Sequence, residues 1–504
     1  MWAEPGGTAL LRRPSTLRLD GHDAGWFAAR QRPILLGLAA PVVAFALGVM
    51  AMHKLDLAVA GLVGVGLVVA VLVRPVIGGI ILVGAVPILS GMATGIPVPH
   101  VRASELIVGL VGMTVIATTR RADAVAWSML DWLLLAYGLA WAFFGVLDAL
   151  NLHQHLSLDA WGTTIGQLQF FLIYRGVRLS LRSAAERRLA TKVLLAAAVP
   201  VSLLALLQEL HVGVVSRFLN TITGGLAAEI TASMETGHSL RATGPFNNWA
   251  ALAGYLLPVL LVLCALSFSG QIRRHRRATV AVGLCVLIGL LVTIEISAMA
   301  LLVLGAVLLA RQYGLGRRVI RYAGAVLLVG VLVAAPFIAP RFAAEFSASP
   351  GSSRPAGVPQ TLAFRWNVWT GQYLPAIGNR PLTGYGSELP SSITWVYPES
   401  QYISYLIEGG LPMLLLFGAL AWAMVEESRR AGRSKDPFEQ ALGRAVAVSV
   451  GAMLVMNLIW PFLSNGGMPQ VLWCLLAITV PRRPSPAVPA VAAEAALVPT
   501  GGAS

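Results

Sequence analysis

The sequence predicts an all-α membrane protein, a polytopic helical bundle with about 14 transmembrane segments (12–14), and three observations favour this fold class. Only 12% of the 504 residues are charged and 57% are hydrophobic, whereas soluble globular proteins carry about 25% charged residues. Apolar runs of roughly 20 residues, long enough to cross a bilayer as helices, recur along the whole chain. A span in hydrocarbon must satisfy its own backbone polar groups, so these runs are predicted to be helical.

The predicted spans cover about half of the chain. Each is an apolar run bounded by polar or basic residues. The two runs 278–295 and 297–311 are short enough to form a re-entrant or tilted hairpin, and the last span is short as well. In chain order the predicted spans are 34–51, 55–72, 75–92, 104–118, 127–147, 159–177, 191–210, 249–268, 278–295, 297–311, 322–338, 403–425, 444–463 and 467–480.

The distribution of Lys and Arg predicts the orientation of these spans. With the N-terminus inside and the spans alternating, most of the 37 basic residues lie on the cytoplasmic side, and a shift by one span inverts this bias. We therefore expect a multi-pass protein of the bacterial inner (plasma) membrane with both termini cytoplasmic. The expected organisation is a cytoplasmic segment 1–33, a transmembrane domain 34–480 and a disordered cytoplasmic tail 481–504.

Two long segments, 211–248 and 339–402, are predicted outside the cytoplasm. Connections of this length are usually functional or disordered. The second segment is rich in Trp and Tyr, and disordered segments are poor in aromatic residues. We therefore expect a partly helical extracytoplasmic loop domain, with the two loops forming the active-site face.

Basic residues on the outer side run against the charge bias and are candidates for function. Arg241 lies just before a predicted span, and Arg365 lies among aromatic residues of the second loop. A guanidinium at the membrane face can bind a pyrophosphate through two parallel hydrogen bonds. Contacts with lipid headgroups or loop salt bridges are the alternative for any single residue. The outer basic residues are Lys54, Arg102, Arg217, Arg241, Arg341, Arg354, Arg365 and Arg380.

Acidic residues near the outer face are candidates for proton transfer. Glu399 lies where the second loop returns to the membrane, and a half-buried carboxylate there can act as a general base. A favourable charge at a helix N-terminus explains Glu399 equally well. For Glu408, inside the following span, and Glu295, at the hairpin tip, function and packing are equal alternatives, and Asp131 is a weaker candidate.

Several classes of chemistry lack a signal in the sequence. There is no phosphate-binding glycine loop, dinucleotide fingerprint or nucleophile elbow, so chemistry driven by cytoplasmic ATP is not indicated. His153 and His155 are close together, but no further ligands complete a metal site. The three cysteines lie in apolar stretches and predict no disulfide. The net charge of +14 follows the membrane topology and does not indicate nucleic acid as a partner.

Three motifs flank the two outer loops. One begins at Arg241 and reads Arg-Ala-Thr-Gly-Pro-Phe-Asn-Asn. Another joins Arg365-Trp-Asn-Val-Trp to Pro381-Leu-Thr-Gly-Tyr-Gly, and the third, Gln401-Tyr-Ile-Ser-Tyr-Leu-Ile-Glu-Gly-Gly, returns into the membrane. In pattern, order and topology the chain resembles the O-antigen ligase and O-antigen polymerase superfamily of bacterial membrane glycosyltransferases.

The resemblance implies a helical fold of the GT-C type and a metal-independent inverting glycosyltransferase without a cofactor. Its expected partners are a polyprenyl-pyrophosphate-linked glycan donor, a glycan or lipid acceptor with a free hydroxyl, and membrane lipids. Arg241 and Arg365 would neutralise the leaving pyrophosphate, because charge builds up there in the transition state. Glu399 completes the expected catalytic set. The expected substrate-binding residues are Arg217, Arg380, Trp369, Asn248, Tyr385, Tyr402 and Glu408.

Two departures from the family pattern bear on this expectation. Glu399 stands where many ligases have a His, so a carboxylate would be the base or would position the acceptor. Ala298 stands where the family often has an Arg at the hairpin tip, and Arg217 and Arg380 are candidates to supply the missing charge. A secondary transporter or flippase for an envelope precursor, and a non-catalytic scaffold of envelope assembly, are the alternative functions.

Overall fold

The computed structural model describes residues 55–95, 97–98, 101–119, 125–151, 158–225, 241–272, 276–316, 343, 346, 358–386, 389–464 and 466–480. The chain divides into two compact units, Met1–Val63 and Gly64–Ser504. Of the first unit, only residues 55–63, the start of helix α2, are described. The predicted spans 34–51 and 322–338 and the two predicted terminal segments, 1–33 and 481–504, lie outside the described residues.

The described part of the chain is mainly helical, as predicted. Its one regular pairing of strands is a short antiparallel hairpin of β1 (Pro97–Val98) and β2 (Val101–Arg102). The helices of ten or more residues are α2 (Leu55–Val73), α3 (Pro75–Gly84), α7 (Met129–Asn151), α9 (Leu168–Ser180), α10 (Ala184–Glu209), α11 (Gly213–Thr223), α13 (Trp249–Phe268), α14 (Arg276–Leu291), α15 (Ile296–Gln312), α19 (Gln401–Ala431), α20 (Pro437–Met456) and α21 (Met468–Thr479). The shorter ones include α4 (Val86–Leu89), α5 (Ala103–Ile107), η1 (Val108–Gly112), α6 (Met113–Thr118), α8 (Leu158–Gly166) and η5 (Phe462–Ser464).

Five of the described helices are long and apolar enough to cross a membrane, namely α7, α10, α13, α19 and α20. The prediction of about 14 spans therefore stays a prediction. Several predicted boundaries differ from the helices. The run 278–295 is helical only to Leu291, because the chain reverses between α14 and α15 through Ile294, whose φ is 51°.

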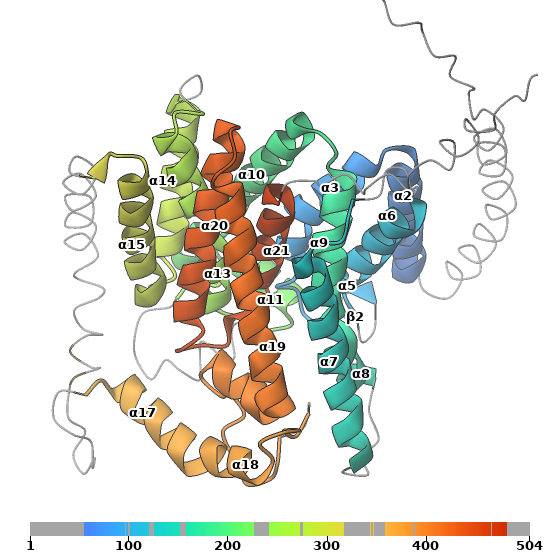
Figure 1. Ribbon diagram of the computed structural model, residues 1–504, viewed down its shortest axis with the longest axis vertical. Coiled ribbons are helices and arrows are strands. Elements are labelled where there is room, and N and C mark those ends of the chain that lie inside the picture. Colours follow the sequence, from blue (N-terminus) through green and yellow to red (C-terminus); the bar gives the residue numbers. More distant parts are fainter. Residues whose placement is uncertain are drawn as a thin grey trace, which may run out of the picture. The chain divides into compact units, whose positions relative to one another are not determined.

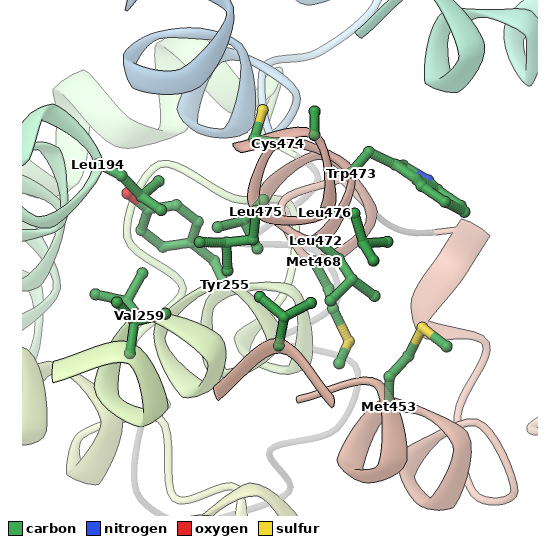
Figure 2. Close-up of a cluster of buried hydrophobic side chains, with 14 of the residues drawn as sticks. Leu194, Tyr255, Val259, Met453, Met468, Leu472, Trp473, Cys474, Leu475 and Leu476 are labelled. Atoms are coloured by element: carbon green, nitrogen blue, oxygen red, sulfur yellow. The ribbon is translucent and has the colours of Figure 1, made fainter. Parts of the chain in front are cut away.

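The core of the larger unit lies around α13 and α21. In α13, 83% of the apolar window is buried, the largest share among the five long helices. All twelve residues of α21 are buried, which explains why it is apolar on every side despite being too short to span a bilayer. Figure 2 shows Leu475 of α21 beside Tyr255 of α13, in a cluster of buried side chains that also includes Leu472, Leu476 and Met468 of α21 and Met453 of α20.

Helix α19 is broken at Gly410, and the preceding loop fills the break. Gly410 has φ 67° and ψ −165°, a conformation that only glycine adopts readily. The amide of Leu411 donates to the carbonyl of Pro381 (2.7 Å), and the amide of Tyr385 donates to that of Ile407 (2.7 Å). The backbone groups that the break frees are thus paired with the Pro-Leu-Thr-Gly-Tyr-Gly motif.

The segment before this loop forms a nearly continuous helical rod, α17 (Gln360–Val368), η4 (Trp369–Tyr373) and α18 (Leu374–Asn379). It packs through a small apolar cluster of its own, which includes Tyr373, Ile377 and Ile407 of α19. Figure 1 shows this rod running across one end of the long helices, beside the start of α19. The rod places Arg365 of α17 at that end of the unit.

Candidate active site

A cavity of about 680 Å³ lies between the rod and the ends of α13 and α15. Residues from separate parts of the chain line it: the segment starting at Arg241, the turn before α15, helix α17, and the stretch before α19. Its volume falls within the range of small-molecule sites, about 300–1,000 Å³. The three residues that the sequence marks as catalytic, Arg241, Arg365 and Glu399, all line this cavity.

The Arg241 segment is fixed by hydrogen bonds to two neighbouring helices. The side-chain oxygen of Gln208, near the end of α10, accepts from the amides of Thr243 (3.0 Å) and Gly244 (2.9 Å). The amide of Ala242 donates to the carbonyl of Val292, just beyond α14 (3.1 Å). These contacts join the first motif to the hairpin of α14 and α15, and they leave Arg241 at the cavity wall.

The residues that follow Arg241 begin helix α13. The side chain of Asn248 accepts from the amide of Ala251 (2.7 Å) and caps the helix. The guanidinium carbon of Arg241 lies 4.5 Å from the ring centroid of Trp249, a cation–π contact that restrains the side chain. Asn248, expected to bind substrate, is thus buried as a helix cap, and its expected substrate role stays a prediction.

Arg365 and Glu399 form an ion pair inside the cavity. The Nε of Arg365 lies 3.2 Å from Oε2 of Glu399, whose side chain is only 6% exposed. Burial raises the pKa of Glu399 above its usual range, and the neighbouring Arg365 opposes that rise. The indole of Trp369 donates to the carbonyl of Pro398 (2.7 Å) and fixes the segment directly before Glu399. The backbone of Glu399 is left-handed, with φ 54°.

Glu295 lies on the same cavity wall, directly before α15. Its Oε1 accepts a hydrogen bond from the hydroxyl of Ser297 (2.5 Å), and its amide donates to the hydroxyl of Thr293 (3.2 Å). Arg365 attracts the Glu295 carboxylate electrostatically. Among the described residues, however, the ion pair that Arg365 forms within 4.0 Å is the one with Glu399. The cavity therefore holds two carboxylates and two guanidinium groups.

Aromatic side chains form much of the remaining wall. Trp249, Phe364, Trp395 and Trp460 all line the cavity, and the rings of Phe364 and Trp395 meet edge to face at 5.0 Å. Trp395 belongs to the aromatic loop noted in the sequence. The sequence did not mark Trp249 or Trp460 as site residues. Only the position of Trp249, directly after the first motif, could have pointed to the cavity.

The remaining predicted substrate-binding residues lie outside the lining of this cavity. Arg217 of α11 is exposed, and its Nε donates to the carbonyl of Gly213 (3.3 Å). The hydroxyl of Tyr402 donates to the carbonyl of Leu454 (2.9 Å). Glu408 lines a separate small space of about 10 Å³ with Trp141. The substrate roles expected for these residues stay predictions.

Arg380 also lies away from the cavity lining. Its Nη1 is 3.8 Å from Oδ1 of the buried Asp148 on α7, and its guanidinium lies 5.0 Å from the ring centroid of Tyr385. Neither Arg380 nor Arg217 lines the cavity, so within the described part of the chain the positive charge of that lining comes from Arg241 and Arg365. In the same part of the chain, no cluster of three or more His, Cys, Asp and Glu residues could hold a metal ion.

Comparison with known proteins agrees with two of the three motifs, since the first, at Arg241, lies outside the matched residues. No curated protein matches the chain. A family model described as O-antigen ligase matches residues 281–418, a range that includes Glu295, Arg365 and Glu399. The match supports a part in polysaccharide biosynthesis, and the five helices that are apolar and long enough to cross a membrane support a membrane protein. The match confirms the resemblance of this chain to the O-antigen ligase superfamily.

Proposed function

We propose that the protein transfers or polymerises a glycan, moving it from a polyprenyl-pyrophosphate carrier to an acceptor hydroxyl in the assembly of envelope polysaccharide. The observation that carries the proposal is the convergence of Arg241 and Arg365 on one cavity beside two carboxylates. The proposed setting is the extracytoplasmic face of the bacterial inner membrane, with both termini cytoplasmic and a GT-C-type bundle.

The proposed reaction is a single displacement without a metal. The acceptor oxygen forms a bond to the anomeric carbon, the bond from that carbon to the pyrophosphate oxygen breaks, and the electron pair leaves with the pyrophosphate. Arg241 and Arg365 neutralise the charge that develops on this leaving group. A guanidinium suits this task because it can make two parallel hydrogen bonds to phosphate oxygens. Attack from the side opposite the leaving group inverts the anomeric centre.

The remaining cavity residues suit the sugar and the acceptor. Trp249, Trp395 and Trp460 offer apolar faces on which sugar rings can stack. Glu399 holds Arg365 in place through their ion pair. Either Glu399 or Glu295 lies where a carboxylate could receive the proton of the acceptor hydroxyl.

The test is the profile of lipid-linked intermediates in a strain that lacks the protein. The deletion strain should accumulate lipid-linked glycan, and complementation with the wild-type gene should remove the accumulation. Arg241→Ala and Arg365→Ala should fail to cure it at equal expression, because each removes charge from the leaving-group side of the cavity. Normal glycan assembly with both variants would rule out the proposed function.

The break in α19 favours one second candidate, a transporter or flippase. Broken helices with a nearby acid are features of secondary transporters, and Gly410 interrupts α19 two residues after Glu408. The break is filled by the loop that starts at Pro381, however, which leaves less room for a substrate there. Accumulation of an envelope precursor in proteoliposomes under an ion gradient, without glycan transfer, would favour transport.

A further inference from the structure

We propose that Glu295 is the general base that takes the proton of the acceptor hydroxyl, and that Glu399 is a positioning residue for Arg365. The inference rests on the proposed function and divides the work between the two carboxylates of the cavity. From the sequence, a functional role and a packing role for Glu295 were equal alternatives. The fold places Glu295 on the cavity wall.

The partners of Glu399 make it the poorer base of the two. Its Oε2 is 3.2 Å from Nε of Arg365, so the carboxylate is already committed to a cation. A cationic partner favours the ionised form of a carboxylate and opposes the rise in pKa that burial causes. If Glu399 took up a proton during the reaction, it would also release Arg365 while the leaving group needs that guanidinium.

Glu295 has neutral neighbours instead. The hydroxyl of Ser297 donates to its Oε1 (2.5 Å), and the indole of Trp249 lies beside the carboxylate. A neutral hydrogen bond fixes the direction of the carboxylate without the competition of a full positive charge. Arg365 is near enough to attract Glu295 but forms its described ion pair with Glu399. Glu295 therefore remains the carboxylate that is oriented but not paired with a cation in the described cavity.

The backbone holds Glu295 in a strained but well-anchored turn. Ile294 has φ 51°, and a β-branched residue in the left-handed region is a true conformational outlier. Such strain persists where the surroundings enforce it, and it gathers at functional sites. Here the amide of Glu295 donates to Thr293 (3.2 Å), and the carbonyl of Val292 accepts from Ala242, next to Arg241 (3.1 Å). One hydrogen-bonded frame therefore carries both the base and a guanidinium that faces the leaving group.

In the proposed step, the proton of the acceptor hydroxyl passes to Glu295 while the acceptor oxygen forms its bond to the anomeric carbon. The carbon–oxygen bond to the pyrophosphate breaks at the same time, and its electron pair leaves with the carrier. Arg241 and Arg365 hold the resulting charge. After departure of the product, Glu295 returns the proton to water, so that no further reactant is needed.

The test uses the full-length protein in nanodiscs, with lipid-linked glycan extracted from the deletion strain as donor and the envelope glycolipid fraction of the same strain as acceptor. Glu295→Gln should lower kcat by about 100-fold or more at a nearly unchanged KM for the donor, because general bases typically contribute 10²–10⁴-fold. Glu399→Gln should mainly raise the KM for the donor, because Arg365 loses its anchor. Glu426→Gln, a matched change at an exposed pair with Arg430, should leave both constants unchanged.

Chemical rescue separates a base from a structural residue. Formate should restore part of the rate of Glu295→Ala, since it returns a carboxylate to the vacated position, and it should not restore Arg365→Ala. Glu295→Asp, which keeps the carboxylate, should retain partial activity if Glu295→Gln is poorly folded. A kcat within threefold of wild type in Glu295→Gln, with Arg365→Ala inactive, would overturn the inference and leave the proposed function standing. No transfer by wild type would instead overturn the proposed function.

Discussion

Arg365 and Glu399 form an ion pair across 34 positions of the chain, with 3.2 Å between Nε and Oε2. Arg365 belongs to α17, and Glu399 directly precedes α19. The pair therefore ties the rod of α17 to the start of a long apolar helix, at the cavity where Arg241 also lies. A site assembled in this way depends on the position of the rod as much as on the residues themselves.

The two residues should act as one unit in transfer. Arg365→Ala should lower the rate of transfer strongly, and the double variant Arg365→Ala/Glu399→Gln should be no slower than Arg365→Ala, because Glu399 acts through Arg365. Rates measured with lipid-linked donor for the two single variants and the double variant give the coupling. Arg429→Ala, at an exposed position on α19, is the matched control and should keep full activity. Additive losses from the two sites would contradict the proposed dependence.

The raised pKa of Glu399 should appear in the pH dependence of stability. Burial raises this pKa above the ordinary value of about 4.3, so the folded protein binds the proton more tightly than the unfolded chain. The resulting stabilisation is fully present below the unfolded pKa and is lost as the pH rises through the folded pKa. The Tm of wild type in detergent should therefore fall relative to that of Glu399→Gln as the pH rises above about 4, the ordinary pKa of the unfolded carboxyl. A difference that is constant with pH would contradict the shift.

The break in α19 should tolerate no side chain. A Cβ at Gly410 would lie 2.5 Å from the backbone carbon of Leu382, and its φ of 67° disfavours other residues. Gly410→Ala should cost about 1–3 kcal/mol in backbone strain alone and displace the loop that pairs with the break. Folded yield and Tm in detergent measure the effect. Gly418→Ala, where a Cβ meets no atom within 4 Å, should be neutral or stabilising, and equal loss in both would contradict this explanation.

Gln208 should matter for transfer although it lies outside the cavity lining. Gln208→Ala removes the acceptor for the amides of Thr243 and Gly244. A buried amide left without an acceptor costs about 1–3 kcal/mol of folding free energy. The segment with Arg241 should shift, and kcat/KM for the donor should fall by about tenfold or more. Steady-state rates at matched expression check the change. Gln312→Ala, at an exposed site near the end of α15, is the control, and an equal effect there would count against the role of Gln208.

The sequence by itself determined the helical class and pointed to three residues that line the cavity. Long apolar runs must become helices because a lipid or apolar environment leaves backbone groups no other partner, and the described helix α13 begins and ends at the residues predicted for it. Motif order also marked Arg241, Arg365 and Glu399, which share one cavity. These properties are local, so they can be recognised without knowing what packs against what.

Only the tertiary structure decided which charged groups meet. Asp131, a weak candidate by sequence, is fully buried and contacts Arg175 and Arg178 of α9. Arg380, a candidate for the pyrophosphate, instead faces Asp148 of α7, and Glu295 joins the cavity through a strained turn. Such encounters depend on how helices distant in sequence pack together, and the periodicity of a single segment carries no information about its neighbour.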